Sequence, residues 1–323
     1  MPLPPPLRPD SRIALVAPAS PPRSPDDLVA GVAALEARGL SVEAPHLAPT
    51  GYLAASDAER AAALNALLAR DDLDALVCVR GGYGVLRLLD RLDYAAARRH
   101  PKLIVGYSDI TALHLALFAH AGLPGLSGPM AAPDWPRFAE SDAGRTAEAQ
   151  FWVLAGGTAP VEIVGPGGEA LAPMQPGAAT GTLLGGNLSL VAALLGTPYL
   201  PDLTGAILFV EDIGEAPYRI DGLLARLRLA GLLNRLGGLV FGAFTSTTPP
   251  SGQPASFTVD EVLEHYASSL AIPVARGLVY GHFPVKSTLP VGIRARLTVT
   301  GTTASLTVLD PVAGGPQAAG HRS

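Results

Sequence analysis

The chain has 323 residues, 48 % of them apolar, and a formal net charge of −5 at pH 7. This length exceeds that of a typical single domain, so two domains are expected. The mild acidity, with no basic patch interleaved with aromatic residues, argues against a nucleic-acid partner. The single cysteine, Cys78, excludes an internal disulfide framework and a cysteine-rich zinc site, and its apolar neighbours predict a buried side chain.

The N-terminus is a Pro-rich arm over residues 1–11, which we expect to be flexible. It lacks the basic region and apolar core of a signal peptide. No uninterrupted apolar segment is long enough to span a bilayer. We therefore expect a cytoplasmic protein that has no membrane partner.

The first half of the chain, residues 12–156, alternates apolar runs with helix-forming segments. Strands are expected at 12–17, 40–45, 75–79 and in the run that ends at Tyr107, and helices at 26–38, 57–70, 84–92 and 109–121. This alternation predicts an α/β domain built on a parallel sheet with helices on both faces. Such sheets place ligands at the carboxyl ends of their strands, where Ser108 and residues 80–84 lie.

A helix at 146–154 precedes a Gly- and Pro-rich stretch, which indicates a linker over 157–180 with some strand pairing. The second domain would then cover 181–311. Its expected elements are strands at 206–210, 239–244 and 274–280, helices at 220–236 and 258–269, and an antiparallel pair at 295–300 and 305–309. Residues 312–323 are expected to be a disordered tail.

Ser108 follows a buried strand and precedes a helix. A nucleophilic serine needs such a turn, because its oxygen must project clear of the sheet. The unpaired N–H groups at the start of the helix also stabilise developing negative charge. The fragment alone leaves a second interpretation open, in which Ser108 is only the N-cap of the helix.

A catalytic serine needs a base and an acid that orients the base. His282 is the best placed of the seven histidines, because it follows a strand in a loop stiffened by two prolines. The alternative is a surface-loop histidine without a role. Glu211, at the end of an apolar strand, is the strongest acid candidate, with Asp212 and Glu215 as alternatives and an ordinary strand-end cap as the competing explanation.

An oxyanion hole requires backbone N–H groups that point at the developing charge. The Asp109 N–H follows the nucleophile directly, and Gly82 in the turn 81–84 could supply a second donor because glycine allows close approach. This turn is a poor nucleotide signature, since it lacks the third glycine of G-x-G-x-x-G.

Several segments together resemble the bacterial LD-carboxypeptidase family, the serine peptidases that trim murein tetrapeptides. The similarity covers roughly residues 12–310, in the order of the family's motifs. The matching segments are Arg80-Gly81-Gly82-Tyr83-Gly84, Gly106-Tyr107-Ser108-Asp109-Ile110-Thr111, Gly185-Gly186-Asn187-Leu188, Glu211-Asp212-Ile213-Gly214-Glu215 with Tyr218-Arg219-Ile220-Asp221, and Gly281-His282 with Lys286 and Thr288-Leu289-Pro290.

The resemblance implies that Ser108 is the nucleophile, His282 the general base and Glu211 the acid. It implies a first domain like class I glutamine amidotransferases, a smaller C-terminal α/β domain, a site between them, a homodimer, and no metal or cofactor. The implied reaction is hydrolysis of the amide between an L-centre diamino acid and a terminal D-alanine, in cell-wall recycling. Arg80 and Tyr83 are candidates for substrate contacts, although a structural salt bridge would equally explain Arg80.

Two departures and two rival functions bear on this assignment. Ile110 stands where the α/β-hydrolase elbow has its second glycine, and the lone mid-strand cysteine argues against a working glutamine amidotransferase.

One rival is a peptidase like the microcin C self-immunity enzyme, which stacks a nucleobase on an aromatic residue. The only tryptophans, Trp135 and Trp152, adjoin no triad motif in the sequence, which disfavours this rival. The other is a non-catalytic protein that binds murein fragments, which would have no use for a nucleophile, base and acid.

Overall fold

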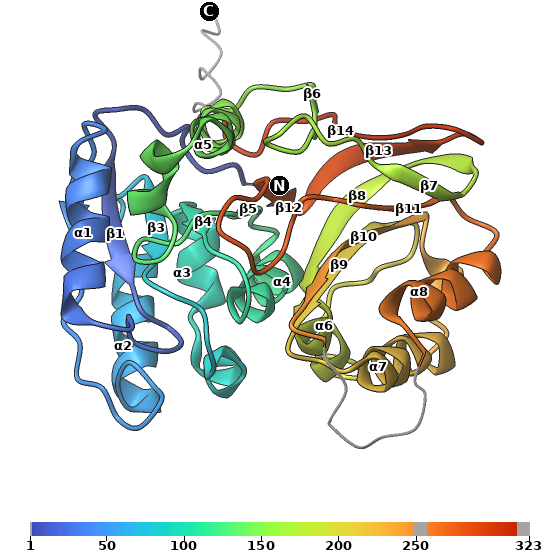
Figure 1. Cartoon of the computed structure of the whole chain (residues 1–323). Coiled ribbons are helices and arrows are strands. Elements are labelled where there is room, and N and C mark those ends of the chain that lie inside the picture. Colours follow the sequence, from blue (N-terminus) through green and yellow to red (C-terminus); the bar gives the residue numbers. More distant parts are fainter. Residues whose placement is uncertain (1, 248–256, 315–323) are drawn as a thin grey trace, which may run out of the picture.

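The computed structural model describes residues 2–247 and 257–314, whose strands form two sheets. The six-stranded sheet has the order β12-β5-β4-β3-β1-β2, and the eight-stranded sheet has the order β6-β14-β13-β8-β9-β10-β11-β7. In Figure 1 the two sheets lie side by side, with α1 to α4 around the first and α6 to α8 along one side of the second. The predicted α/β class with a parallel sheet is confirmed.

The first sheet is parallel except at one edge, where β12 pairs antiparallel with β5. Capping boxes begin two of its helices: Ser24 with Asp27 for α1, and Ser56 with Glu59 for α2. Its elements are β1 (Arg12–Val16), α1 (Pro25–Glu36), β2 (Ser41–Glu43), α2 (Asp57–Leu68), β3 (Ala75–Cys78), α3 (Tyr94–Arg99), β4 (Leu103–Val105), α4 (Ile110–Ala121), β5 (Gly125–Ser127) and β12 (Leu289–Val291).

The second sheet has a parallel centre, β8-β9-β10-β11, and antiparallel strands at both edges. Helix α5 (Asp142–Ala155) precedes it in the chain. Its elements are β6 (Val161–Glu162), β7 (Ala172–Gln175), β8 (Gly177–Asn187), α6 (Leu188–Ala193), β9 (Ile207–Ile213), α7 (Pro217–Leu229), β10 (Gly238–Thr245), α8 (Val259–Ser268), β11 (Val274–Arg276), β13 (Ile293–Val299) and β14 (Ala304–Val308).

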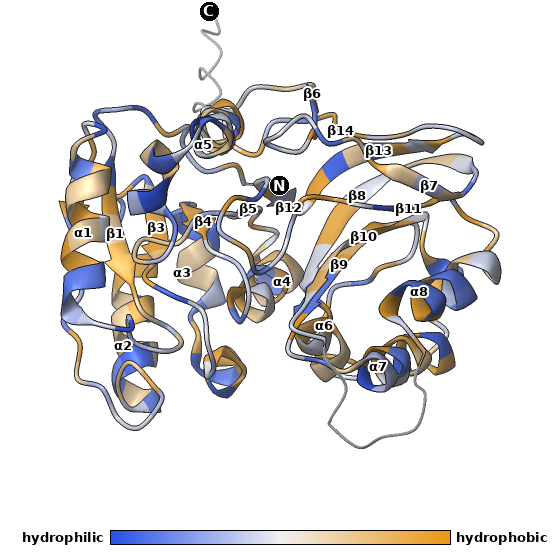
Figure 2. Ribbon diagram, viewed as in Figure 1, coloured by the Kyte–Doolittle hydropathy of each residue, from blue (hydrophilic) through white to orange (hydrophobic). Residues whose placement is uncertain are grey.

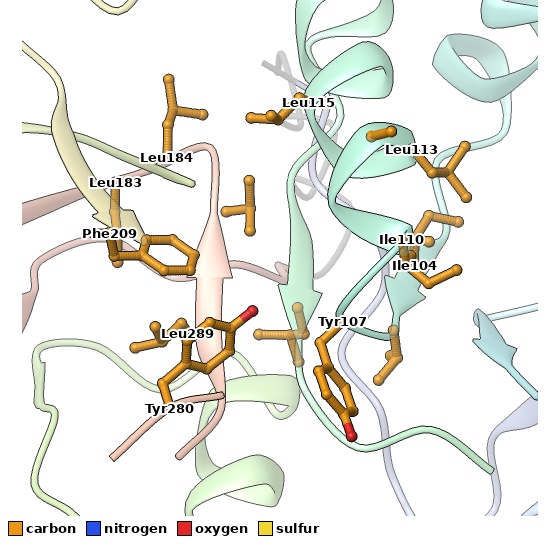
Figure 3. Close-up of a cluster of buried hydrophobic side chains, with 14 of the residues drawn as sticks. Ile104, Tyr107, Ile110, Leu113, Leu115, Leu183, Leu184, Phe209, Tyr280 and Leu289 are labelled. Carbon is orange, nitrogen blue, oxygen red and sulfur yellow. The ribbon is translucent and has the colours of Figure 1, made fainter. Parts of the chain in front are cut away.

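The two halves of the chain meet through apolar side chains. In Figure 3, Phe209 of β9 and Tyr280 lie opposite Tyr107 and Ile110, and all of them are buried. Figure 2 shows apolar residues along the strands and hydrophilic residues on the outer parts of the helices. Burial of this surface holds the carboxyl ends of β4 and β9 near each other, and those ends carry Ser108 and Glu211.

The chain termini and the expected linker differ from their predicted states. Leu7 in the Pro-rich arm is buried and its N–H donates to Ala155 O at 2.9 Å, so that part of the arm is packed rather than free. Val312 and Ala313 are also buried, whereas the rest of the expected tail, 315–323, lies outside the described residues. The expected linker 157–180 contains β6, β7 and the start of β8, because these strands find partners in the second sheet.

Three further expectations need correction. Residues 84–92 form two short 3₁₀ turns (Val85–Arg87 and Leu89–Arg91) instead of one helix. The strand expected at 274–280 ends at Arg276, because the chain then leaves the sheet and crosses to the first one as β12. The helix expected to run to residue 236 ends at Leu229, and a 3₁₀ turn (Leu233–Arg235) follows it. Among the described residues, no helix is long and apolar enough to cross a bilayer.

Candidate active site

Ser108, His282 and Glu211 form one hydrogen-bonded chain. The Ser108 Oγ lies 2.8 Å from His282 Nε2, and His282 Nδ1 lies 2.7 Å from Glu211 Oε2. Glu211 is fully buried, whereas His282 retains some solvent access. A carboxylate can only accept, so His282 donates from Nδ1 and is left with Nε2 as an acceptor for the serine hydroxyl. The three side chains are thus arranged to move a proton away from Ser108.

Ser108 has a backbone conformation that is uncommon for a residue with a side chain. Its φ is +65°, in the left-handed region, which turns the chain sharply between β4 and α4. The N-cap position of α4 is Asp109, and the Ser108 hydroxyl contacts His282 instead of the helix. The structure therefore does not support a capping role for Ser108, and the turn resembles a nucleophile elbow although Ile110 replaces the second glycine.

Asn187 binds the oxygen of Glu211 that does not contact His282. Its side-chain amide donates to Glu211 Oε1 at 3.3 Å and to Asp212 Oδ1 at 2.8 Å, and its backbone N–H donates to Thr111 Oγ1 at 2.9 Å. Both Glu211 oxygens are therefore engaged, and the acid is linked through Asn187 to the helix that follows Ser108. In the sequence, Asn187 stands out only as part of the Gly185-Gly186-Asn187-Leu188 motif; an amide residue directly after an apolar and glycine run is the signal that could have pointed to this role.

The two alternative acids have other partners. Asp212 accepts hydrogen bonds from the backbone N–H and the hydroxyl of Ser189, at 2.9 and 2.7 Å. Glu215 pairs with Arg219 one helical turn later. Only Glu211 among the three contacts His282.

The turn that carries Gly82 is held against the nucleophile. The Ser20 N–H donates to Gly81 O at 3.1 Å, and the Tyr83 N–H donates to Ser20 Oγ at 3.2 Å. Gly82 has a φ of +105°, and a Cβ there would lie 2.2 Å from Ser20 Oγ, so only glycine fits. Neither the Gly82 nor the Asp109 N–H donates to another residue within 2–247 and 257–314, so both are available to a ligand.

The Asp109 side chain also holds the turn 81–84 in place, through a hydrogen bond at its end. Its Oδ2 accepts the Val85 N–H at 2.9 Å, which joins the residue after the nucleophile to the end of the glycine turn. Burial raises the pKa of this carboxyl to about 6, against the opposing effects of the Val85 hydrogen bond and the Arg60 charge.

Arg80 directly precedes this glycine turn, and Tyr83 lies within it. Arg80 is half-buried, and its Nη1 donates to Pro21 O at 3.1 Å; it pairs with no carboxylate in the part of the chain that the structure describes. The salt-bridge explanation of Arg80 is thus not supported. Tyr83 is 71 % exposed and makes an edge-on contact with Tyr52, their ring centroids 6.1 Å apart.

The remaining features have partners other than the triad residues. His114 is buried with Nε2 3.3 Å from Ile104 O, and His120 packs against Tyr94 and Tyr199. Cys78 is buried as expected, and burial raises the pKa of its thiol. A cavity of about 400 Å³, lined by residues 15–17, 43–48, 54–55 and one side of α2, contains no triad residue.

Comparison with known proteins places the chain in a family. The LD-carboxypeptidase N-terminal domain matches residues 13–128, and the LD-carboxypeptidase C-terminal domain matches residues 180–297. The chain belongs to the LD-carboxypeptidase family, and this membership supports a carboxypeptidase enzyme. This confirms the resemblance seen in the sequence.

Individual relatives match over nearly their whole length. A protein of Bacillus subtilis named "Probable murein peptide carboxypeptidase" is 36 % identical, with 90 % of each chain covered. The murein tetrapeptide carboxypeptidase of Pseudomonas aeruginosa is 31 % identical over 89 % of this chain and 93 % of its own. The crystal structure of muramoyltetrapeptide carboxypeptidase from Oxalobacter formigenes has a TM-score of 0.80 and 33 % identity, and covers 93 % of this chain and 99 % of that chain.

The rival microcin-type function is not favoured. The microcin C7 self-immunity protein MccF of Escherichia coli is 25 % identical over 79 % of this chain and 80 % of its own, which is a lower identity than that of the murein enzymes. Trp135 is buried, and its ring packs edge-on against Phe138, Phe151 and Trp152. Both tryptophans thus belong to one packed aromatic cluster.

Proposed function

We propose that this protein is a serine-type LD-carboxypeptidase that releases the terminal D-alanine from murein tetrapeptides by cleaving its amide to an L-centre diamino acid. The proposal rests chiefly on the 2.8 Å contact between Ser108 Oγ and His282 Nε2 in a chain of this family. The expected cytoplasmic location belongs to the same proposal, since a recycling enzyme meets its muropeptides inside the cell. The homodimer is proposed on the family resemblance alone.

The proposed reaction is acyl transfer to water. The Ser108 oxygen attacks the carbonyl carbon while His282 Nε2 takes the hydroxyl proton, and Glu211 stabilises the imidazolium that forms. The N–H groups of Gly82 and Asp109 donate to the oxyanion. Collapse of the tetrahedral intermediate breaks the C–N bond, and His282 returns the proton to the D-alanine amine. A water molecule then hydrolyses the acyl-enzyme with His282 again as the base.

Arg80 is proposed to bind the terminal carboxylate of the substrate. It is an arginine without a carboxylate partner in residues 2–247 and 257–314, and it adjoins Gly81, which contacts Ser108. Tyr83, exposed beside the same turn, is proposed to cover the bound peptide. A tetrapeptide with a C-terminal amide should have a raised KM with the wild-type protein and an unaltered KM with Arg80→Met; an equal rise in both would contradict this role.

The direct test is incubation of the purified protein with murein tetrapeptide. We expect free D-alanine and the tripeptide, no product from Ser108→Ala, and no cleavage of an aminoacyl sulfamoyl nucleotide. Glu211→Gln should lower kcat by about 10⁴-fold with little change in KM, because the imidazole loses its orienting carboxylate. Tetrapeptide that is bound by wild-type protein but never cleaved would replace this proposal with a non-catalytic binding function.

A further inference from the structure

Lysine is used at only two positions in this chain, Lys102 and Lys286, although lysine and arginine together number 23. Both lysines are buried, which is unusual for this residue type. The Lys102 Nζ donates to two backbone carbonyls, Leu68 O at 3.1 Å and His100 O at 2.9 Å, at the amino end of β4. Lys286 instead lies four residues after His282, in the loop 277–288 that joins β11 to β12 and is called here the His282 loop.

Among the described residues, the Lys286 ammonium makes three contacts, all with the half of the chain that carries Ser108. Its Nζ is 2.6 Å from Asp134 Oδ1, in an ion pair whose two side chains are 5 % and 6 % exposed. The same Nζ donates to the Tyr107 hydroxyl at 3.2 Å and lies over that ring, 4.2 Å from its centroid. A compact ammonium group can satisfy all three contacts at once, which a planar guanidinium would not do in the same space.

The partners of Lys286 are themselves fixed. The other oxygen of Asp134 accepts the Met130 N–H at 2.9 Å, and the adjacent Ala131 N–H donates to Cys78 O at 2.9 Å, at the carboxyl end of β3. Tyr107 is the residue before the nucleophile, and its ring centroid is 5.4 Å from that of His282. Lys286 therefore joins a segment anchored to the first sheet, the Ser108 turn and the His282 loop.

We propose that Lys286 is a positioning residue: its buried contacts with Asp134 and Tyr107 fasten the His282 loop onto the Ser108 turn and so set the distance between base and nucleophile. The inference rests on the proposed function of the Ser108 site. His282 comes from a loop and not from a strand, so its backbone needs such a tie to hold Nε2 within hydrogen-bond distance of Ser108. Lys286 does not touch the reacting atoms.

The test compares Lys286→Met with Lys102→Met, which removes the other buried ammonium at a site remote from the triad. We expect Lys286→Met to lower kcat for tetrapeptide by about 10²-fold with KM changed less than about threefold, because the base is displaced. Lys102→Met should keep kcat near the wild-type value. A proton NMR spectrum gives a second measurement, since the His282 Nδ1–H in its bond to Glu211 should resonate far downfield. That signal should shift or broaden in Lys286→Met and not in Lys102→Met.

The double variant Lys286→Met/Asp134→Asn separates positioning from stability. Removing both charges leaves no unpaired buried ion, so Tm should recover relative to Lys286→Met while kcat stays low. Recovery of kcat together with Tm would overturn the proposal, as would a Lys286→Met protein with wild-type kcat and an unshifted His282 signal. The NMR comparison needs no substrate, so it decides the role of Lys286 even if wild-type protein fails to cleave tetrapeptide and the proposed function falls.

Discussion

Gly81 and Ser108 touch so closely that no side chain fits between them. A Cβ on Gly81 would lie 2.9 Å from the Ser108 Cβ and 3.1 Å from its Oγ. Gly81→Ala should therefore displace the nucleophile and lower kcat for tetrapeptide by about 10²-fold, as measured by steady-state kinetics. Gly222→Ala is the matched control, because a Cβ there meets nothing within 4 Å in helix α7. The control should keep wild-type kcat and gain up to about 1 kcal/mol of stability; wild-type kcat in Gly81→Ala would contradict the prediction.

The left-handed backbone of Ser108 predicts a difference between two inactive variants. Both Ser108→Ala and Ser108→Gly lose the nucleophile and the hydrogen bond to His282. Glycine accepts a φ of +65° without steric cost, whereas alanine does not. The free energy of unfolding in urea should be about 1 kcal/mol higher for Ser108→Gly than for Ser108→Ala. Equal free energies of unfolding for the two variants would mean that the backbone of residue 108 is not strained.

The raised pKa of Asp109 predicts a pH-dependent effect of Asp109→Asn. Burial raises the pKa of this carboxyl to about 6 from its ordinary 3.8. Folding therefore favours the protonated form of Asp109. The contribution of this group to the free energy of unfolding is complete below pH 3.8 and is lost as the pH rises through 6. Asparagine keeps an oxygen for the Val85 N–H and has no charge to bury.

The measurement is the free energy of unfolding of Asp109→Asn minus that of wild type, at several pH values. This difference should rise between about pH 4 and pH 7, by up to about 3 kcal/mol in favour of the variant. A difference that stays constant over that range would show that the Asp109 carboxyl is ionised without penalty in the folded protein.

Much of the site could be predicted from sequence because Ser108 follows a buried apolar strand and Glu211 lies near the end of another, a placement that local patterns reveal. The two-sheet arrangement was harder. Residues 177–187 are rich in glycine, alanine and threonine and do not look like a strand, yet β8 forms between β9 and β13. Its state is decided by partners distant in the sequence. The same holds for residues 84–92, where the Asp109 carboxylate binds the Val85 N–H and a helix does not form.

The pairing of β12 with β5 affects how the two halves of the protein could be separated. β11 belongs to the second sheet and β12 to the first, and only Gly292 stands between β12 and β13, which returns to the second. The first half is thus not a self-contained module: a truncation before residue 289 would strip the first sheet of its edge strand. Gene fusion or shuffling of residues 12–156 alone would leave the first sheet without β12, whereas all eight strands of the second sheet lie within residues 161–308.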